Sequence, residues 1–227
     1  MNKLLSIASG AISPSAPKVV SAFGSFANSL DALLVEMNGF YAFESALHVF
    51  PSGEAGLPGR SVEEWNSKSL WRDSYGHLMP DVIFFAEDVF GGQFAVARDG
   101  VVYSFNPETA ALVRFSEDVA RWRGDVIADW NHATGYSVGH EWQMRNGPLP
   151  VGHRLVPKIP FVVGGEFSCE NMVPVEAAAA LKYWGRFALA IAGGRDGDQF
   201  RFDPNVIEGL RCGIWSSRGE STCRCFG

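Results

Sequence analysis

Four apolar segments separated by tight-turn residues fill positions 79–115, and this spacing constrains the fold more than any other part of the sequence. Acidic and glycine residues (Glu87-Asp88, Gly91-Gly92) follow the first segment, Asp99-Gly100 follows the second, and Asn106-Pro107 follows the third. An Asp-Gly pair between alternating apolar residues is typical of a tight β-hairpin turn. Because short connections force neighbouring strands to run in opposite directions, this region predicts an antiparallel meander.

Helical patterns lie on both sides of this meander. Apolar residues recur at helical spacing over residues 25–37, and a helix is expected to follow Ser116-Glu117-Asp118 and to run to about Ala133. An alanine-rich segment, Val173–Ala192, is expected to form the last helix, with Pro174 in its first turn. The sequence therefore predicts an α+β fold, in which helices pack around a twisted, mainly antiparallel sheet. Further expected elements are a short helix with a Ser61–Glu64 capping box and short strands at Leu155, 161–163 and 200–202.

The chain has 227 residues, which fits one domain with extensions. Residues 1–24 are rich in Ser, Ala and Pro and are expected to form a loosely ordered leader, residues 25–203 the domain, and residues 204–227 a tail. Cys169 is the only cysteine before this tail, which holds Cys212, Cys223 and Cys225. A disulfide framework for the core is therefore excluded, and a reducing, cytoplasmic location is expected.

Composition and charge limit the kinds of partner. Hydrophobic residues make up 47% of the chain and charged residues 19%, which indicates a folded core. The formal net charge of −6 argues against nucleic-acid binding, because an acidic protein repels phosphates. It favours a basic protein partner, since opposite potentials speed association. No apolar segment approaches the length needed to span a bilayer, so no membrane association is expected.

The motifs for catalysis and metal binding are incomplete. Residues Gly135–Gly139 match the Gly-x-Ser-x-Gly pattern around Ser137, but a helix is expected before the serine where a hydrolase has a strand. The five histidines are scattered, and none forms a pair at metal-ligand spacing. The Cys-Arg-Cys end has no histidine nearby to complete a zinc site. We therefore expect no enzyme activity, no cofactor and no metal.

Acidic and aromatic residues outside the expected core are candidates for partner binding. Asp88 is expected to accept hydrogen bonds from backbone N–H groups of its turn, Glu87 to face solvent, and Trp142 to be an exposed aromatic contact. His48 lies in an apolar run, which favours a hydrogen-bonded core histidine, and Trp65, Trp71, Trp122 and Trp130 are mostly expected in the core. The predicted partner-binding residues are Glu87, Asp88, Asp99, Asp125, Asp129, Glu141 and Trp142.

Several of these motifs, in this order, resemble the SUKH superfamily, which comprises Smi/Knr-type proteins and bacterial toxin-immunity proteins. The resemblance covers about residues 25–203 and lies in residues 38–51, in residues 84–94, in the Asn106–Thr109 turn with the Phe115–Trp122 helix start, and in residues 161–171. It implies a single α+β domain without a shared catalytic set. For bacterial members it implies direct binding and inhibition of a toxin.

Two main functional hypotheses follow. The first is a non-enzymatic immunity protein that masks the active site of a cognate toxin, and the negative charge would suit a basic toxin such as a nuclease. The second is a scaffold or regulatory module that binds a cellular protein, as eukaryotic relatives of the family imply. A third and weaker hypothesis is a hydrolase that uses Ser137.

Overall fold

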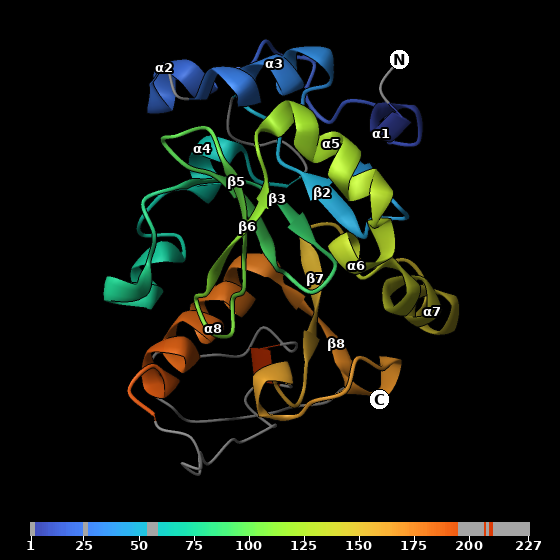
Figure 1. The fold of residues 1–227 in the computed structure, drawn as a ribbon. Coiled ribbons are helices and arrows are strands. Elements are labelled where there is room, and N and C mark those ends of the chain that lie inside the picture. The colour runs from blue at the N-terminus through green and yellow to red at the C-terminus, as the bar shows by residue number, and fades with distance from the viewer. Residues whose placement is uncertain (1–2, 25–26, 54–58, 195–206, 208, 211–227) are drawn as a thin grey trace.

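Six strands form one antiparallel sheet, in which each strand lies beside the next one along the chain (Figure 1). The structure is a computed structural model that describes residues 3–24, 27–53, 59–194, 207 and 209–210. The predicted meander is confirmed as the last four strands of the sheet. A hairpin formed from residues 40–49 adds two more strands at one edge. The strands are β1 (Phe40–Ala42), β2 (Leu47–Val49), β3 (Ile83–Asp88), β4 (Gln93–Val96), β5 (Val102–Phe105) and β6 (Leu112–Ser116).

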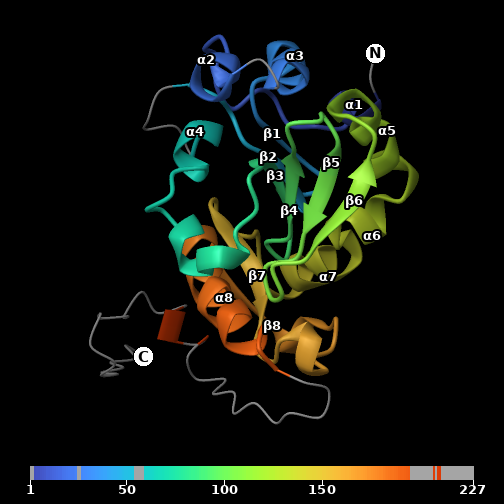
Figure 2. The same ribbon diagram turned by 60° about the vertical axis from the view of Figure 1, so that its left-hand side comes forward.

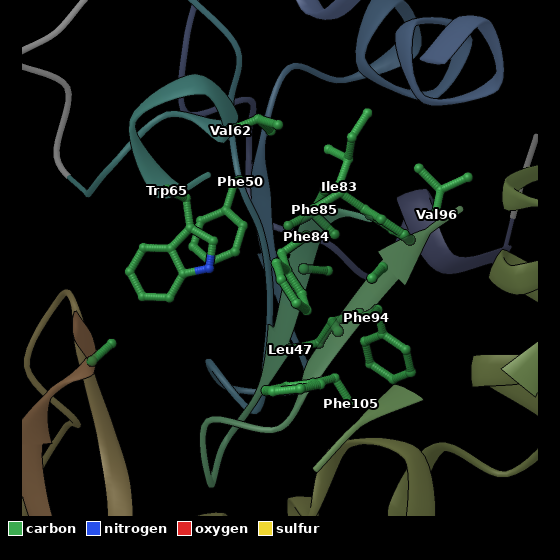
Figure 3. Close-up of a cluster of buried hydrophobic side chains, with 14 of the residues drawn as sticks. Leu47, Phe50, Val62, Trp65, Ile83, Phe84, Phe85, Phe94, Val96 and Phe105 are labelled. Atoms are coloured by element: carbon green, nitrogen blue, oxygen red, sulfur yellow. The ribbon is translucent and has the colours of Figure 1, made fainter. Parts of the chain in front are cut away.

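The sheet is covered on both faces, which explains why β3 is apolar at every position from Ile83 to Ala86. Phe84 points toward Trp71 and Phe105, whereas Phe85 points to the opposite face and packs against Trp122. Figure 2 shows the two helical groups, with α5 (Val119–Ala128), α6 (Trp130–Thr134) and α7 (Tyr136–Asn146) on one side. On the other side lie α4 (Val62–Trp65), the 3-10 helix η2 (Arg72–Leu78) and α8 (Ala177–Ile191). Figure 3 shows the aromatic and aliphatic side chains around β2–β4 that these layers bury.

A second, two-stranded antiparallel sheet joins β7 (His153–Pro157) to β8 (Met172–Glu176). Leu155 donates its backbone N–H to the Val89 carbonyl at 2.8 Å, so β7 is attached to the turn between β3 and β4. The predicted start of the last helix was wrong, because Pro174 lies in β8 opposite Leu155 and the helix begins at Ala177. The missing N–H of proline is tolerated because this sheet has only two strands, and both of them are edges.

The N-terminal residues contribute structure where a loosely ordered leader was expected. They form α1 (Lys3–Ser6) and α2 (Val19–Phe23) ahead of α3 (Asn28–Glu36), and Leu4 and Val19 are completely buried. Ser9 donates its backbone N–H to the Tyr41 carbonyl at 2.7 Å, so the segment runs along the β1 edge. Covering an edge strand in this way satisfies polar groups that would otherwise pair with another chain.

Three local predictions need correction. The helix expected to run to Ala133 is broken at Asp129 into α5 and α6. Residues 136–146, expected to be a loop, form α7, which begins directly after Gly135 ends α6 in the left-handed conformation. Gly139 lies inside α7, where the absence of a side chain allows close packing. Residues 161–163 form a 3-10 turn (η3, Phe161–Val163) instead of a strand, between Pro160 and Gly164. The predicted strand 200–202 and Cys212, Cys223 and Cys225 lie outside the described residues, whereas the Ser61–Glu64 capping box is confirmed.

The contact between α8 and η2 depends on a glycine. A Cβ atom at Gly185 would lie 2.7 Å from the Ser74 backbone carbon and 2.8 Å from the Ser74 carbonyl oxygen. Because backbone atoms cannot move aside, Gly185→Ala should lower the free energy of unfolding by about 1–3 kcal/mol. Gly124→Ala in α5 is the matched control, since nothing lies within 4 Å of its Cβ, and it should raise stability by about 0.5–1 kcal/mol. Urea unfolding followed by tryptophan fluorescence measures both, and equal effects would contradict this packing.

Candidate functional site

The acidic corner at the end of β3 is buried and carries an ion pair. Glu87 is 1% exposed, and its Oε1 lies 2.8 Å from Arg154 Nη2 on β7 and 3.1 Å from His48 Nδ1 on β2. Gln93 Nε2 approaches Glu87 Oε2 at 3.4 Å, and the Trp65 indole donates to Gln93 Oε1 at 2.8 Å. The expectation that Glu87 faces solvent was therefore wrong, because a cation 67 positions along the chain compensates its charge.

The charge states of this network follow from its burial. Burial alone raises the pKa of Glu87, but the Arg154 guanidinium and His48 outweigh it and hold that pKa below its usual range. Burial lowers the pKa of His48, so the imidazole is neutral near pH 7 with its Nδ1–H toward Glu87. His48 is thus the hydrogen-bonded core histidine predicted from the sequence.

Asp88 lies next to this network and closes the turn between β3 and β4. Its Oδ1 accepts the backbone N–H groups of Phe90 at 2.8 Å and Gly92 at 2.9 Å, which confirms the predicted turn role. A Cβ at Gly92 would lie 2.3 Å from Asp88 Oδ2, so the carboxylate can hold this position only because residue 92 has no side chain. Burial raises the pKa of Asp88 to about 7, against the opposing effect of the two N–H donors.

The other predicted partner-binding residues lie on several elements. Trp142 was expected to be exposed but is 7% exposed, because α7 places it in a small second core that also contains Val89 and Leu155. Asp129 is exposed between α5 and α6, and Asp99 is exposed in the β4–β5 turn. Asp125 lies near Arg121 on α5, and Glu141 pairs with Arg145 on α7. The seven predicted residues therefore do not form one acidic patch.

The Gly-x-Ser-x-Gly pattern has a packing explanation. Ser137 donates its hydroxyl to Asn131 Oδ1 at 2.7 Å and so ties the start of α7 to α6. A Cβ at Gly135 would lie 2.3 Å from the Phe90 ring, and one at Gly139 would lie 3.0 Å from Val89. Both glycines therefore allow α7 to approach the β3–β4 turn, and the described contacts give Ser137 no histidine partner.

A cavity of about 370 Å³ opens beside the buried network, with His48, Trp65, Glu87 and Glu176 among its lining residues. A carboxylate–histidine pair can activate a hydroxyl or thiol nucleophile. The described lining residues include no serine, threonine or cysteine for His48 to activate. The Glu87–His48–Arg154 network joins the two sheets, because Glu87 and His48 belong to the six-stranded sheet and Arg154 to the two-stranded one.

An exposed segment, residues 159–167, has the character of a protein-binding surface, and we name it the apolar loop. Phe167 is 63% exposed, and three further large apolar side chains of the loop are also exposed: Ile159, Val162 and Val163. The Phe161 and Phe167 rings stack with centroids 3.8 Å apart, and the Phe90 edge meets both. Groups of exposed apolar side chains are a feature of interaction sites, so the apolar loop is a candidate for one.

Buried polar side chains fix the backbone of the apolar loop. Glu108, from the β5–β6 turn, accepts the N–H groups of Phe161 at 3.0 Å and Val162 at 2.9 Å. Asn171 accepts the Ile159 N–H and donates to the carbonyls of Ile159 and Glu166. Sequence reasoning missed this loop by assigning residues 161–163 to a strand, although Pro160 and Gly164-Gly165 on either side of them are turn signals.

Within the described part of the chain, no three or more His, Cys, Asp or Glu residues gather where they could hold a metal ion. None of the helices described there combines the length and apolar character needed to cross a bilayer.

Comparisons with known proteins concern the fold alone. No family model matches the chain, and no curated protein matches it. The structure is similar to the crystal structure of Atu4351 from Agrobacterium tumefaciens, with a TM-score of 0.55 over 82% of this chain and 89% of that chain. The two sequences are 16% identical, so the similarity concerns the fold and assigns no function.

Proposed function

We propose that the protein is a non-enzymatic immunity protein that binds a bacterial toxin and masks the toxin's active site. The observation that carries this proposal is the apolar loop, in which exposed apolar side chains stand on a backbone fixed by Glu108 and Asn171. A surface that is already ordered loses little entropy on binding, so more of its contact energy appears as affinity. The SUKH-like motifs of the sequence support the same class of function.

The charge of the chain favours a basic toxin. A net charge of −6 would speed association with a positively charged protein and would suit a nuclease, whose active site attracts phosphates. An immunity protein of this kind acts where the toxin acts, so we propose a cytoplasmic location. Exposed Asp99 and Asp129 are the members of the predicted set best placed to contribute to this long-range attraction.

Co-expression tests the proposal directly. The product of the reading frame immediately upstream of this protein's gene would be expressed in cells with and without the chain, and the two proteins tested for a complex. Toxicity that the chain relieves, together with a stable complex, is the expected result. A toxic product that the chain neither relieves nor binds would refute immunity for this pair.

A substitution in the apolar loop should weaken the complex without unfolding the protein. Val163→Lys places a positive charge on the apolar loop, where it would repel a basic partner. We expect the complex to be at least about tenfold weaker, measured by calorimetry. Val113→Lys on β6 is the matched control, since that valine is also exposed. Both variants should keep their stability to within about 0.5 kcal/mol. Equal affinities for the two variants would place the contact elsewhere.

The second candidate function, a scaffold or regulatory module, rests on the same loop. It predicts a complex with a cellular protein that is harmless when expressed alone. The co-expression experiment separates the two functions, because only immunity requires a toxic partner.

A further inference from the structure

A row of aromatic rings lies beside the β1–β2 turn. Phe43 stacks on Trp130 with centroids 6.0 Å apart, Trp130 meets the Tyr136 edge at 5.0 Å, and Tyr136 stacks on His140 at 5.4 Å. Trp130, expected mostly in the core, is 39% exposed. Phe43, Trp130 and Tyr136 border a groove of about 460 Å³, which we name the aromatic groove. It is also lined by Glu44, Ile127, Ile7 and Lys3.

The turn that carries Phe43 and Glu44 has an unusual backbone. Phe43, Glu44 and Ser45 all have positive φ angles, of 51°, 53° and 72°, and residues other than glycine seldom adopt such angles. Gln143 donates to the Glu44 carbonyl at 2.8 Å, and Arg154 donates to the Ser45 carbonyl at 3.2 Å. Such conformations persist where surrounding contacts impose them, and they cluster at functional sites.

The carboxylate of Glu44 is held in place at the groove while remaining open to solvent. Its Oε1 accepts the Tyr136 hydroxyl at 3.2 Å, and its Oε2 lies 2.7 Å from His140 Nδ1. The side chain is nevertheless 54% exposed, so further acceptor positions on both oxygens face outward. The hydrogen bond with His140 lowers the pKa of Glu44, which keeps the carboxylate ionised at neutral pH.

We infer that the aromatic groove binds an arginine side chain of the partner protein, an inference that rests on the proposed function. The planar guanidinium stacks on aromatic faces such as that of Trp130, and its fork of N–H donors matches the fixed carboxylate of Glu44. Lysine offers neither the plane nor the fork, so arginine is the better fit. Basic partners supply such side chains, and arginine is enriched at the energetic centres of protein interfaces.

Lys3 is the one feature of the described lining that opposes a cation. It is exposed on the short helix α1 and makes no ion pair with Glu44 in the described structure. An exposed lysine side chain can turn into solvent at little cost, because its charge is strongly hydrated. Lys3→Ala should therefore leave arginine binding unchanged or strengthen it.

A titration with a small probe tests the groove without knowledge of the partner. The full chain, labelled with ¹⁵N, is titrated with N-acetyl-arginine amide, and the indole N–H signal of Trp130, assigned from a Trp130→Phe variant, is followed by NMR. The expected result is a shift that saturates. The matching citrulline amide, which has nearly the same shape without the charge, should give no saturable shift.

Charge variants complete this test. Glu44→Gln keeps the hydrogen-bond acceptor but removes the charge, and it should weaken binding of the arginine probe at least about fivefold. Asp81→Asn is the matched control, because Asp81 is also exposed. It lies just before the first residue of β3, whereas the β1–β2 turn lies near the last residue of that strand. Saturable binding of the citrulline probe, no saturation with arginine, or a smaller effect of Glu44→Gln would each overturn the inference.

Measurements on the complex separate this inference from the proposed function. If the chain neutralises the toxin, Trp130→Ala and Glu44→Gln should each weaken the complex by about tenfold or more. Unchanged affinity in both variants would overturn the aromatic groove and leave immunity standing. If no toxin is bound, the proposed function fails, while the arginine titration still decides what the groove binds.

Discussion

Replacing Arg154 with methionine should lower the free energy of unfolding by about 3–5 kcal/mol, the largest effect that we expect from a single substitution. Methionine keeps most of the volume but leaves the Glu87 carboxylate buried without its cation, since Glu87 and Arg154 are each 1% exposed. The substitution also removes the donor to the Ser45 carbonyl, so it loosens the β1–β2 turn. Urea unfolding near neutral pH measures the loss.

Two controls show whether the effect comes from the unpaired charge. Glu87→Gln combined with Arg154→Met removes both charges and should recover at least about half of the lost stability, because a buried pair costs much less to remove than to break. Arg121→Ala breaks the exposed pair with Glu117 and should cost less than about 1 kcal/mol. A double variant as unstable as Arg154→Met alone would mean that lost packing, rather than charge, explains the result.

The parts of the fold that depend on contacts between residues close in the sequence could be predicted. The β3–β6 meander was predictable because Asp99-Gly100 and Asn106-Pro107 form turns through contacts within each turn. The Asp88 turn was predictable for the same reason. The α+β class followed, because the apolar patterns on either side of the meander could only be buried against it.

Burial that depends on distant residues was not predictable. Nothing near Glu87 in the sequence indicates that Arg154 will lie 2.8 Å away, so an acidic residue at a turn was assigned to the surface. Trp142 has polar neighbours on both sides, and only the packing of α7 against the β3–β4 turn buries it. The exposed Trp130 was missed for the opposite reason, because helical spacing suggested the core although the helix is broken at Asp129.

The same limits apply to the candidate binding surfaces. The backbone of the apolar loop is fixed by Glu108 and Asn171, which lie outside the loop in the sequence. Their roles depend on where the folded chain places them. The aromatic groove joins the β1–β2 turn to α6 and α7, about 90 residues apart, through contacts such as that of His140 with Glu44. Sequence reasoning could therefore suggest that the protein binds a partner, but it could not locate either surface.

Asp88→Asn should make the protein more stable than the wild type at neutral pH, and the gain should depend on pH. The folded-state pKa of Asp88 is about 7 and its ordinary value is 3.8, so between these two values the folded state binds more protons than the unfolded state. Stability from this group is therefore complete below about pH 4 and is lost as the pH rises to about 7. The shift corresponds to at most ~4 kcal/mol.

Asparagine is the informative replacement because its carbonyl oxygen can still accept the N–H groups of Phe90 and Gly92 without carrying a charge. Glu87 and His48 also have shifted pKa values, both lowered, so their contributions are lost as the pH falls. These contributions are present in both proteins and largely cancel when the variant is compared with the wild type. The difference in unfolding free energy should thus rise between about pH 4 and pH 7 and then level off.

Asp99→Asn supplies the matched control, because Asp99 also accepts a backbone N–H of its own turn, from Val101 at 3.0 Å, but is exposed. At about pH 8 this exposed substitution should change the free energy of unfolding by less than about 0.5 kcal/mol. Urea unfolding of the three proteins at several pH values measures both differences. An Asp88→Asn protein that is less stable than the wild type at about pH 8, or a difference that does not change with pH, would mean that the Asp88 carboxylate is ionised and stabilising in the fold, with Arg154 compensating both acidic residues.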